Sequence, residues 1–70
     1  MRGADLKRAV EAMGFEWSLP AGGSHYRIKT TEGRVVSVSL HNGLRTEIRP
    51  DQLRYIARQL GVAVKDLQKK

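Results

Sequence analysis

The apolar residues at the start of the chain repeat with the period of a helix. They follow the i, i+3, i+4, i+7 spacing of an amphipathic helix: Leu6, Ala9, Val10 and Met13. Gly14 comes directly after them and suits the left-handed conformation in which many helices end. The spacing therefore predicts a helix over residues 4–13.

The next part of the chain alternates between apolar and polar residues, as strands do. A run at 15–19 predicts a first strand, which Pro20 ends. Its apolar face consists of Phe15, Trp17 and Leu19. Two further alternating runs, at 24–30 and 34–41, predict a hairpin whose tight turn has Gly33 at a position of positive φ.

The last part of the chain returns to the helical period. The segment 42–49 is polar and basic, and we expect it to be a connecting loop rather than an element. Pro50 suits the first turn of a second helix that ends at Gly61. Its apolar stripe consists of Leu53, Ile56, Ala57 and Leu60. A short helical turn is predicted at 64–67.

The order α-β-β-β-α predicts an α+β two-layer sandwich. One face of a three-stranded antiparallel sheet would carry both helices, packed together, and the other face would stay open to solvent. With no linker or repeat, residues 1–70 are expected to form a single domain. A chain of this size buries only about 60% of its unfolded surface, so a functional site should lie on an exposed face.

Composition and charge narrow the functions that such a domain can have. The chain has 13 Lys and Arg against 7 Asp and Glu, a net charge of +6, which attracts polyanions such as nucleic acid. It has no cysteine, which excludes disulfides, thiol nucleophiles and cysteine zinc sites. No apolar run approaches the ~20 residues of a membrane span, and the start of the chain lacks the apolar region of a secretory signal. We therefore expect a cytoplasmic protein with no membrane partner.

The alternation of strands two and three gathers polar side chains on the open face of the sheet. These are His25, Arg27, Lys29, Ser37, Ser39 and His41. A hairpin that turns at Glu32-Gly33 places His25 and His41 at the same end of the sheet, as expected cross-strand neighbours. Two histidines without a carboxylate cluster fall short of a metal site, so no metal or cofactor is expected.

A histidine beside cations is a combination that RNA strand cleavage can use. Imidazole, with a reference pKa of ~6.5, takes and gives protons near neutrality. Cleavage needs a base for the ribose 2′-OH, cations for the charge on the phosphorane, and an acid for the leaving 5′-oxygen. We therefore consider His25 a candidate catalytic residue, with an inert surface histidine as the alternative.

Other residues are candidates for assisting His25 or for binding phosphate. His41 is either a second acid or base or a strand-end residue, and Ser24 either assists His25 or caps a turn. Candidate phosphate contacts, or else solvated charges, are Arg27, Lys29, Arg45 and Arg49. Trp17 and Tyr26 fall on the apolar face and are expected in the core rather than as base-stacking platforms.

An ordered set of short motifs along the chain is similar to a known family. The motifs are Met13-Gly14-Phe15, Gly23-Ser24-His25, the run 32–38, His41-Asn42-Gly43, Glu47-Ile48, and Leu53-Arg54-x-Ile56 before Gly61. This set resembles the HicA-type toxins of bacterial toxin-antitoxin systems. The resemblance implies a double-stranded-RNA-binding-domain-like fold and an mRNA interferase that uses neither metal nor organic cofactor. It also implies a HicB-type antitoxin that covers the active face, and it maps the family's catalytic histidine onto His25.

Two readings of a different class stay open at this point. A non-catalytic RNA-binding module would recognise A-form RNA through the first helix and the basic loops without cutting it. A purely protein-binding domain would dock an acidic partner on its positive face. A cleavage assay separates the toxin from both.

Overall fold

Three short strands form an antiparallel sheet in the order β1-β2-β3 in the computed structural model, which describes residues 1–19 and 25–68. The elements are α1 (Gly3–Ala12), β1 (Glu16–Ser18), β2 (His25–Lys29), β3 (Val35–Ser39), the 3-10 helix η1 (Gly43–Arg45), α2 (Pro50–Leu60) and α3 (Val64–Gln68). This order confirms the predicted α+β fold of the α-β-β-β-α type. The three predicted helical segments and three predicted strands all form.

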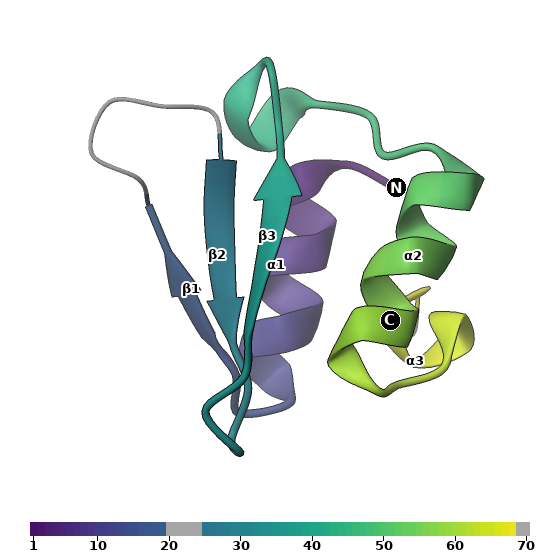
Figure 1. Ribbon diagram of the computed structural model, residues 1–70. Coiled ribbons are helices and arrows are strands. Elements are labelled where there is room, and N and C mark those ends of the chain that lie inside the picture. The colour runs from purple at the N-terminus through teal and green to yellow at the C-terminus, as the bar shows by residue number, and fades with distance from the viewer. Residues whose placement is uncertain (20–24, 69–70) are drawn as a thin grey trace.

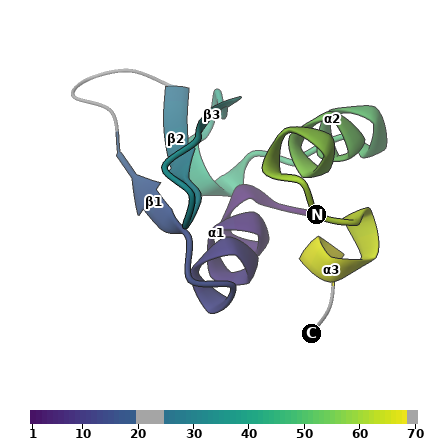
Figure 2. The same ribbon diagram turned by 60° about the horizontal axis from the view of Figure 1, so that its bottom comes forward.

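The helices cover one side of the sheet and leave the other uncovered (Figure 1). α1 packs against β1, α2 packs against β3, and α3 packs against both α1 and α2. Figure 2 shows α1 lying against the sheet and α3 below α2, so α3 joins the two longer helices into one layer. Within residues 1–19 and 25–68, no helix is both long enough and apolar enough to cross a membrane.

The core lies between the sheet and the helices, where the period of each element predicts it. The helical stripes contribute Leu6, Val10, Leu53, Ile56, Ala57, Leu60 and Leu67, and the sheet contributes Ile28, Val36 and Val38. Leu40 and Ile48 complete it from the two ends of the β3–α2 connection. These side chains are all buried, and burial of such aliphatic surface is the main force that holds a domain of this size together.

The hairpin between β2 and β3 turns over three residues. The amide of Thr30 donates to the carbonyl of Arg34 at 2.8 Å, and the amide of Gly33 donates to the carbonyl of Thr30 at 3.0 Å. Gly33 has a φ of +90°, so the prediction of a positive φ there is confirmed. Because Thr30 and Arg34 face each other, the register pairs Lys29 with Val35 and continues along both strands.

Two predictions are wrong, one about the end of the first strand and one about the connection between β3 and α2. β1 ends at Ser18, so Leu19 does not reach the core face, and its exposed fraction is 72%. The segment 42–49 is not only a loop, because it contains η1, and Glu47 forms a β-bridge with Arg2. The partner of this bridge is far away in sequence, so a local pattern gives no sign of it.

Hydrogen bonds fasten α2 along the outer edge of β3. The side-chain amide of Gln52 donates to the carbonyl of Ser39 at 3.4 Å, and the guanidinium of Arg34 donates to the carbonyl of Gln59 at 3.1 Å. Gln52 and Gln59 are two helical turns apart, about 10 Å along the axis. The helix is therefore tied to both ends of the strand.

Candidate nucleic-acid interface on the open sheet face

The open face of the sheet is formed by every second residue of the three strands. We define it by Glu16, Ser18, His25, Arg27, Lys29, Val35, Ser37 and Ser39. Their strand neighbours Ile28, Val36 and Val38 are buried on the opposite side. Since side chains alternate across a strand, the open face points away from the core, and all of its members except the half-buried Ser39 are exposed.

The strand register fixes where the two basic residues of the open face lie relative to His25. Arg27 lies between Ser18 and Ser37, its partners on the two neighbouring strands. Arg27 is two residues from His25, a separation of about 7 Å along the strand. Lys29 lies about 14 Å from His25, at the other end of β2. Arg27 is therefore the cation of β2 that lies nearer to His25 on the open face.

The pairing of the two histidines is not as predicted. The cross-strand partner of His25 is Ser39, not His41. The reason is the position of the turn at 31–33, which places Thr30 opposite Arg34. A three-residue turn one residue further along the chain would have paired His25 with His41. β3 ends at Ser39, and His41 is an exposed residue of the turn that follows. It is still near the end of the sheet where β2 begins, as Figure 1 shows for these two strand ends.

The connection from β3 to α2 carries two more of the predicted cations. Arg45 is the last residue of η1 and is exposed. Arg49 is the N-cap of α2, and its Nε atom lies 3.6 Å from an oxygen of Asp51. The charge of Arg49 is therefore shared with a carboxylate, whereas Arg45 has no ion pair among the described residues. Ser24 lies outside the residues that the structure describes.

This connection is held close to α1 by the backbone. The amide of Gly3 donates to the carbonyl of Thr46 at 2.9 Å, and the amide of Ile48 donates to the carbonyl of Met1 at 2.6 Å. A side chain at Gly3 would approach within 2.9 Å of the Leu40 side chain and 3.3 Å of the Gly43 carbonyl. Because Gly3 has no side chain, the segment that carries His41 and Arg45 can lie close to α1. The sequence reasoning missed this role of Gly3.

The sequence reasoning also missed two members of the open face on the edge strand. Glu16 faces Lys29 and Ser18 faces Arg27 in the pairing of β1 with β2. The sequence pattern could have identified both residues, because the same alternation that directs Trp17 inward directs Glu16 and Ser18 outward. Neither Arg27 nor Lys29 forms an ion pair within residues 1–19 and 25–68, so both keep their charge available to an anion.

The two candidate stacking aromatics belong to the core side, as predicted. Trp17 and Tyr26 are half-buried, pack against the core, and form a tilted pair with ring centroids 5.4 Å apart. In the part of the chain that the structure describes, no three or more His, Asp or Glu residues gather as potential metal ligands. The chemistry that the open face offers is therefore one imidazole with cations beside it.

Comparison with known proteins gives one match. The family model described as the HicA toxin of bacterial toxin-antitoxin systems matches residues 3–62, which include the whole sheet, η1 and α2. No curated protein and no solved structure matches the chain.

Proposed function

The chain belongs to the HicA toxin family of bacterial toxin-antitoxin systems, and on that premise we propose that it is a metal-independent endoribonuclease that cleaves mRNA with His25 as its acid-base group. The observation that carries the proposal is the position of His25. Its side chain is exposed at the start of β2, on an uncovered sheet face, with Arg27 next along the same face. The family membership supports a toxin, and the exposed position of His25 beside Arg27 supports the proposed acid-base role.

The proposed reaction breaks one phosphorus–oxygen bond of the RNA backbone. The imidazole of His25 takes the proton of a ribose 2′-OH, and the 2′-oxygen attacks the adjacent phosphorus. Arg27 neutralises part of the charge on the phosphorane. The bond to the 5′-oxygen then breaks, and this oxygen takes a proton from water or from His41. One RNA fragment then ends in a 2′,3′-cyclic phosphate, and the other begins with a 5′-hydroxyl.

The remaining cations would hold the RNA on either side of the cleaved bond. Lys29 lies further along β2, and Arg45 and Arg49 lie in the connection that follows the opposite end of β3. This arrangement supports phosphate binding along the direction of the strands. The open face carries no Asn or Gln, the side chains that read adenine through a paired donor and acceptor, so we propose a cleavage with little sequence selectivity.

A protein partner would control this activity by covering the open face. We propose that the partner is a HicB-type antitoxin with an acidic contact surface, because charge complementarity favours such a surface against a chain of net charge +6. We place both proteins in the cytoplasm, where mRNA is found. Cleavage should then stop when the partner is added in equimolar amount.

The deciding experiment is RNA cleavage by purified protein in the presence of a chelator. The wild type should cut a labelled mRNA fragment, and His25→Ala should be inactive with an unchanged thermal midpoint, because the side chain is exposed. His41→Ala is the matched variant, with the second histidine removed. It should retain activity if water supplies the last proton, and lose part of it if His41 does.

Equal cleavage by His25→Ala and the wild type would show that the assignment of the catalytic residue is wrong. RNA that binds but is never cut would instead support the non-catalytic RNA-binding module. A complete lack of RNA binding would instead support the purely protein-binding domain.

A further inference from the structure

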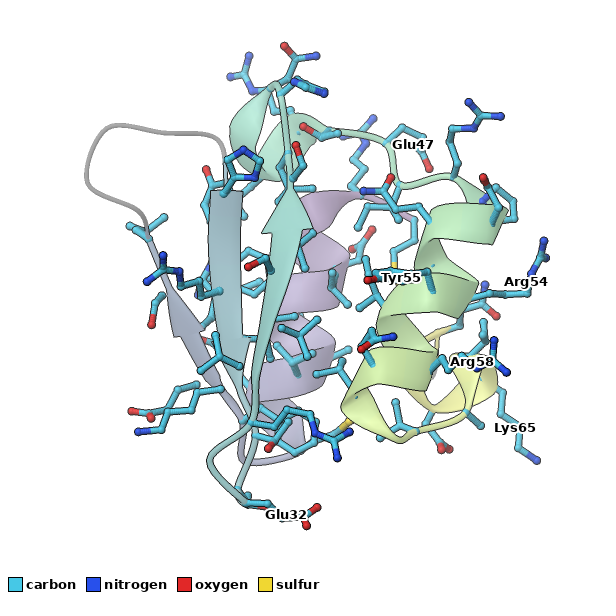
Figure 3. All side chains as sticks on the ribbon, in the orientation of Figure 1. Glu32, Glu47, Arg54, Tyr55, Arg58 and Lys65 are labelled. Carbon is cyan, nitrogen blue, oxygen red and sulfur yellow. The ribbon has the colours of Figure 1, made fainter. Side chains whose placement is uncertain are left out.

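Three basic side chains project from the helical layer on the side away from the sheet. They are Arg54 and Arg58 of α2 and Lys65 of α3, which we call the basic stripe. Figure 3 shows all three pointing outward beyond α2, while the strands lie on its other side. Each is exposed, and Arg54 and Arg58 lie one helical turn apart on the same face of α2.

The acidic residues near the basic stripe are engaged elsewhere. Asp51 lies against Arg49 at 3.6 Å, and Asp66 accepts a hydrogen bond from the backbone amide of Ala63 at 3.3 Å. Glu47, the other nearby carboxylate, pairs with the terminal ammonium of Met1 at 2.6 Å. Within residues 1–19 and 25–68, the basic stripe therefore has no ion pair. Two like charges at i and i+4 also cost the helix a few tenths of a kcal/mol.

The basic stripe is separate from the open face. α2 contacts β3 through Gln52 and Gln59 and the core through its apolar stripe, so the stripe occupies a third face of the helix. The molecule measures 28 × 25 × 19 Å. An RNA of a few nucleotides bound at His25 would not reach the stripe, whereas a longer or folded RNA would pass around this small molecule to it.

We propose that the basic stripe binds the phosphate backbone of a structured RNA outside the segment that is cleaved. This inference rests on the proposed function, since it concerns the same substrate. The spacing of Arg54 and Arg58, about 6 Å, is suited to neighbouring phosphates, and guanidinium groups bind phosphate well. The stripe would make the enzyme select RNA by its length and fold rather than by its sequence.

The chemistry of the stripe favours RNA over a protein partner. The core of a protein interface is usually apolar and depleted of charge. The exposed large apolar side chains of the described residues are Leu19, Val35 and Tyr55. Of these only Tyr55 is on α2, and Figure 3 shows it on the side of the helix nearer the strands, whereas Arg54 and Arg58 point away from them. Exposed cations spaced along one side of the helical layer resemble a phosphate-binding surface.

The test compares two RNA substrates and two double variants, each of which lacks two positive side chains. The substrates are a stem-loop of about 16 base pairs and a single-stranded oligonucleotide of about five nucleotides. The stripe variant is Arg54→Gln with Arg58→Gln. The control is Lys7→Gln with Arg8→Gln on α1, which removes the same formal charge from side chains that pair with Glu11 and Asp5. Glutamine is as good a helix former as the residues it replaces. Binding is measured by fluorescence anisotropy with His25→Ala added to each protein, so that no RNA is cut.

The stripe variant should bind the stem-loop about tenfold more weakly, with a salt slope lower by about one to two. Its binding of the short oligonucleotide should not change. In the proteins that keep His25, kcat/KM should fall for the stem-loop only. Unchanged stem-loop binding, an equal loss for both substrates, or an equal loss in the control pair would each overturn the inference. If the wild type cuts no RNA while these binding differences appear, the proposed function fails and the binding surface stands.

Discussion

At the scale of single residues, Arg27 is the side chain on which catalysis by His25 should depend most. It is exposed in the centre of the open face, about 7 Å along the strand from His25. Arg27→Gln should lower kcat/KM for RNA cleavage by about tenfold, the effect of losing roughly 1.4 kcal/mol of transition-state stabilisation. Its thermal midpoint should stay near that of the wild type, because an exposed substitution rarely costs more than about 0.5 kcal/mol. Arg8→Gln, which removes a charge from α1, should cleave normally.

Gly3 matters for a different reason, which is the lack of a side chain. Its ideal Cβ position lies 2.9 Å from the buried Leu40 and 3.3 Å from backbone atoms of Gly43 and Leu44. Gly3→Val should therefore lower the free energy of unfolding by about 1–3 kcal/mol, the usual cost of overpacking. Urea denaturation measures this, with Ala4→Val on the same helix as the control. An unchanged midpoint would mean that the chain relaxes around position 3.

At the scale of elements, the β2–β3 turn decides which residues meet across the sheet. Gly33 has a φ of +90° and no atom within 4 Å of its ideal Cβ position, so the cost of a side chain there is purely conformational. Gly33→Ala should lower the free energy of unfolding by about 1 kcal/mol. Glu32→Ala, in the same turn, should have almost no effect. If both variants were equally stable, the left-handed conformation at Gly33 would be in doubt.

α3 is the element whose contribution is hardest to see in the sequence. It follows the end of the family match at residue 62, yet its Leu67 is 1% exposed and belongs to the core. Leu67→Ala should cost about 2–5 kcal/mol, as truncation of a buried leucine does. Gln68→Ala, which changes an exposed residue of the same helix, should cost less than about 0.5 kcal/mol. A thermal midpoint of Leu67→Ala equal to that of Gln68→Ala would show that α3 is not docked.

The elements that could be predicted from the sequence are those whose period is long enough to recognise. The stripes of α1 and α2 and the alternation of β2 and β3 are of this kind, and they identified the open face with His25 on it. The register could not be predicted, because it depends on which three residues form the turn: a turn at 31–33 pairs His25 with Ser39, whereas a turn at 32–34 would pair it with His41. The η1 segment and the position of Gly3 depend on contacts between residues 1–3 and 46–48, far apart in the chain.

At the scale of the whole molecule, we expect charge to govern the proposed binding of RNA. The chain has a net charge of +6, and seven of its 13 Lys and Arg residues lie on the open face, on the β3–α2 connection and in the basic stripe. Binding that uses about four phosphate contacts should weaken with salt with a logarithmic slope of about −3 for single-stranded RNA. A titration of the His25→Ala protein with KCl measures this slope. Salt-independent binding would contradict an interface made of phosphate contacts.

The ties between α2 and β3 also have a consequence for how the molecules behave at high concentration. Since Thr30 and Arg34 are hydrogen-bonded to each other, the backbone groups of Val35, Ser37 and Ser39 point outward from the sheet. An uncharged edge strand with free amides and carbonyls is a template on which another chain can add a strand. Gln52 and Arg34 hold α2 against this edge, and so α2 stands in the way of another chain that would add a strand to β3.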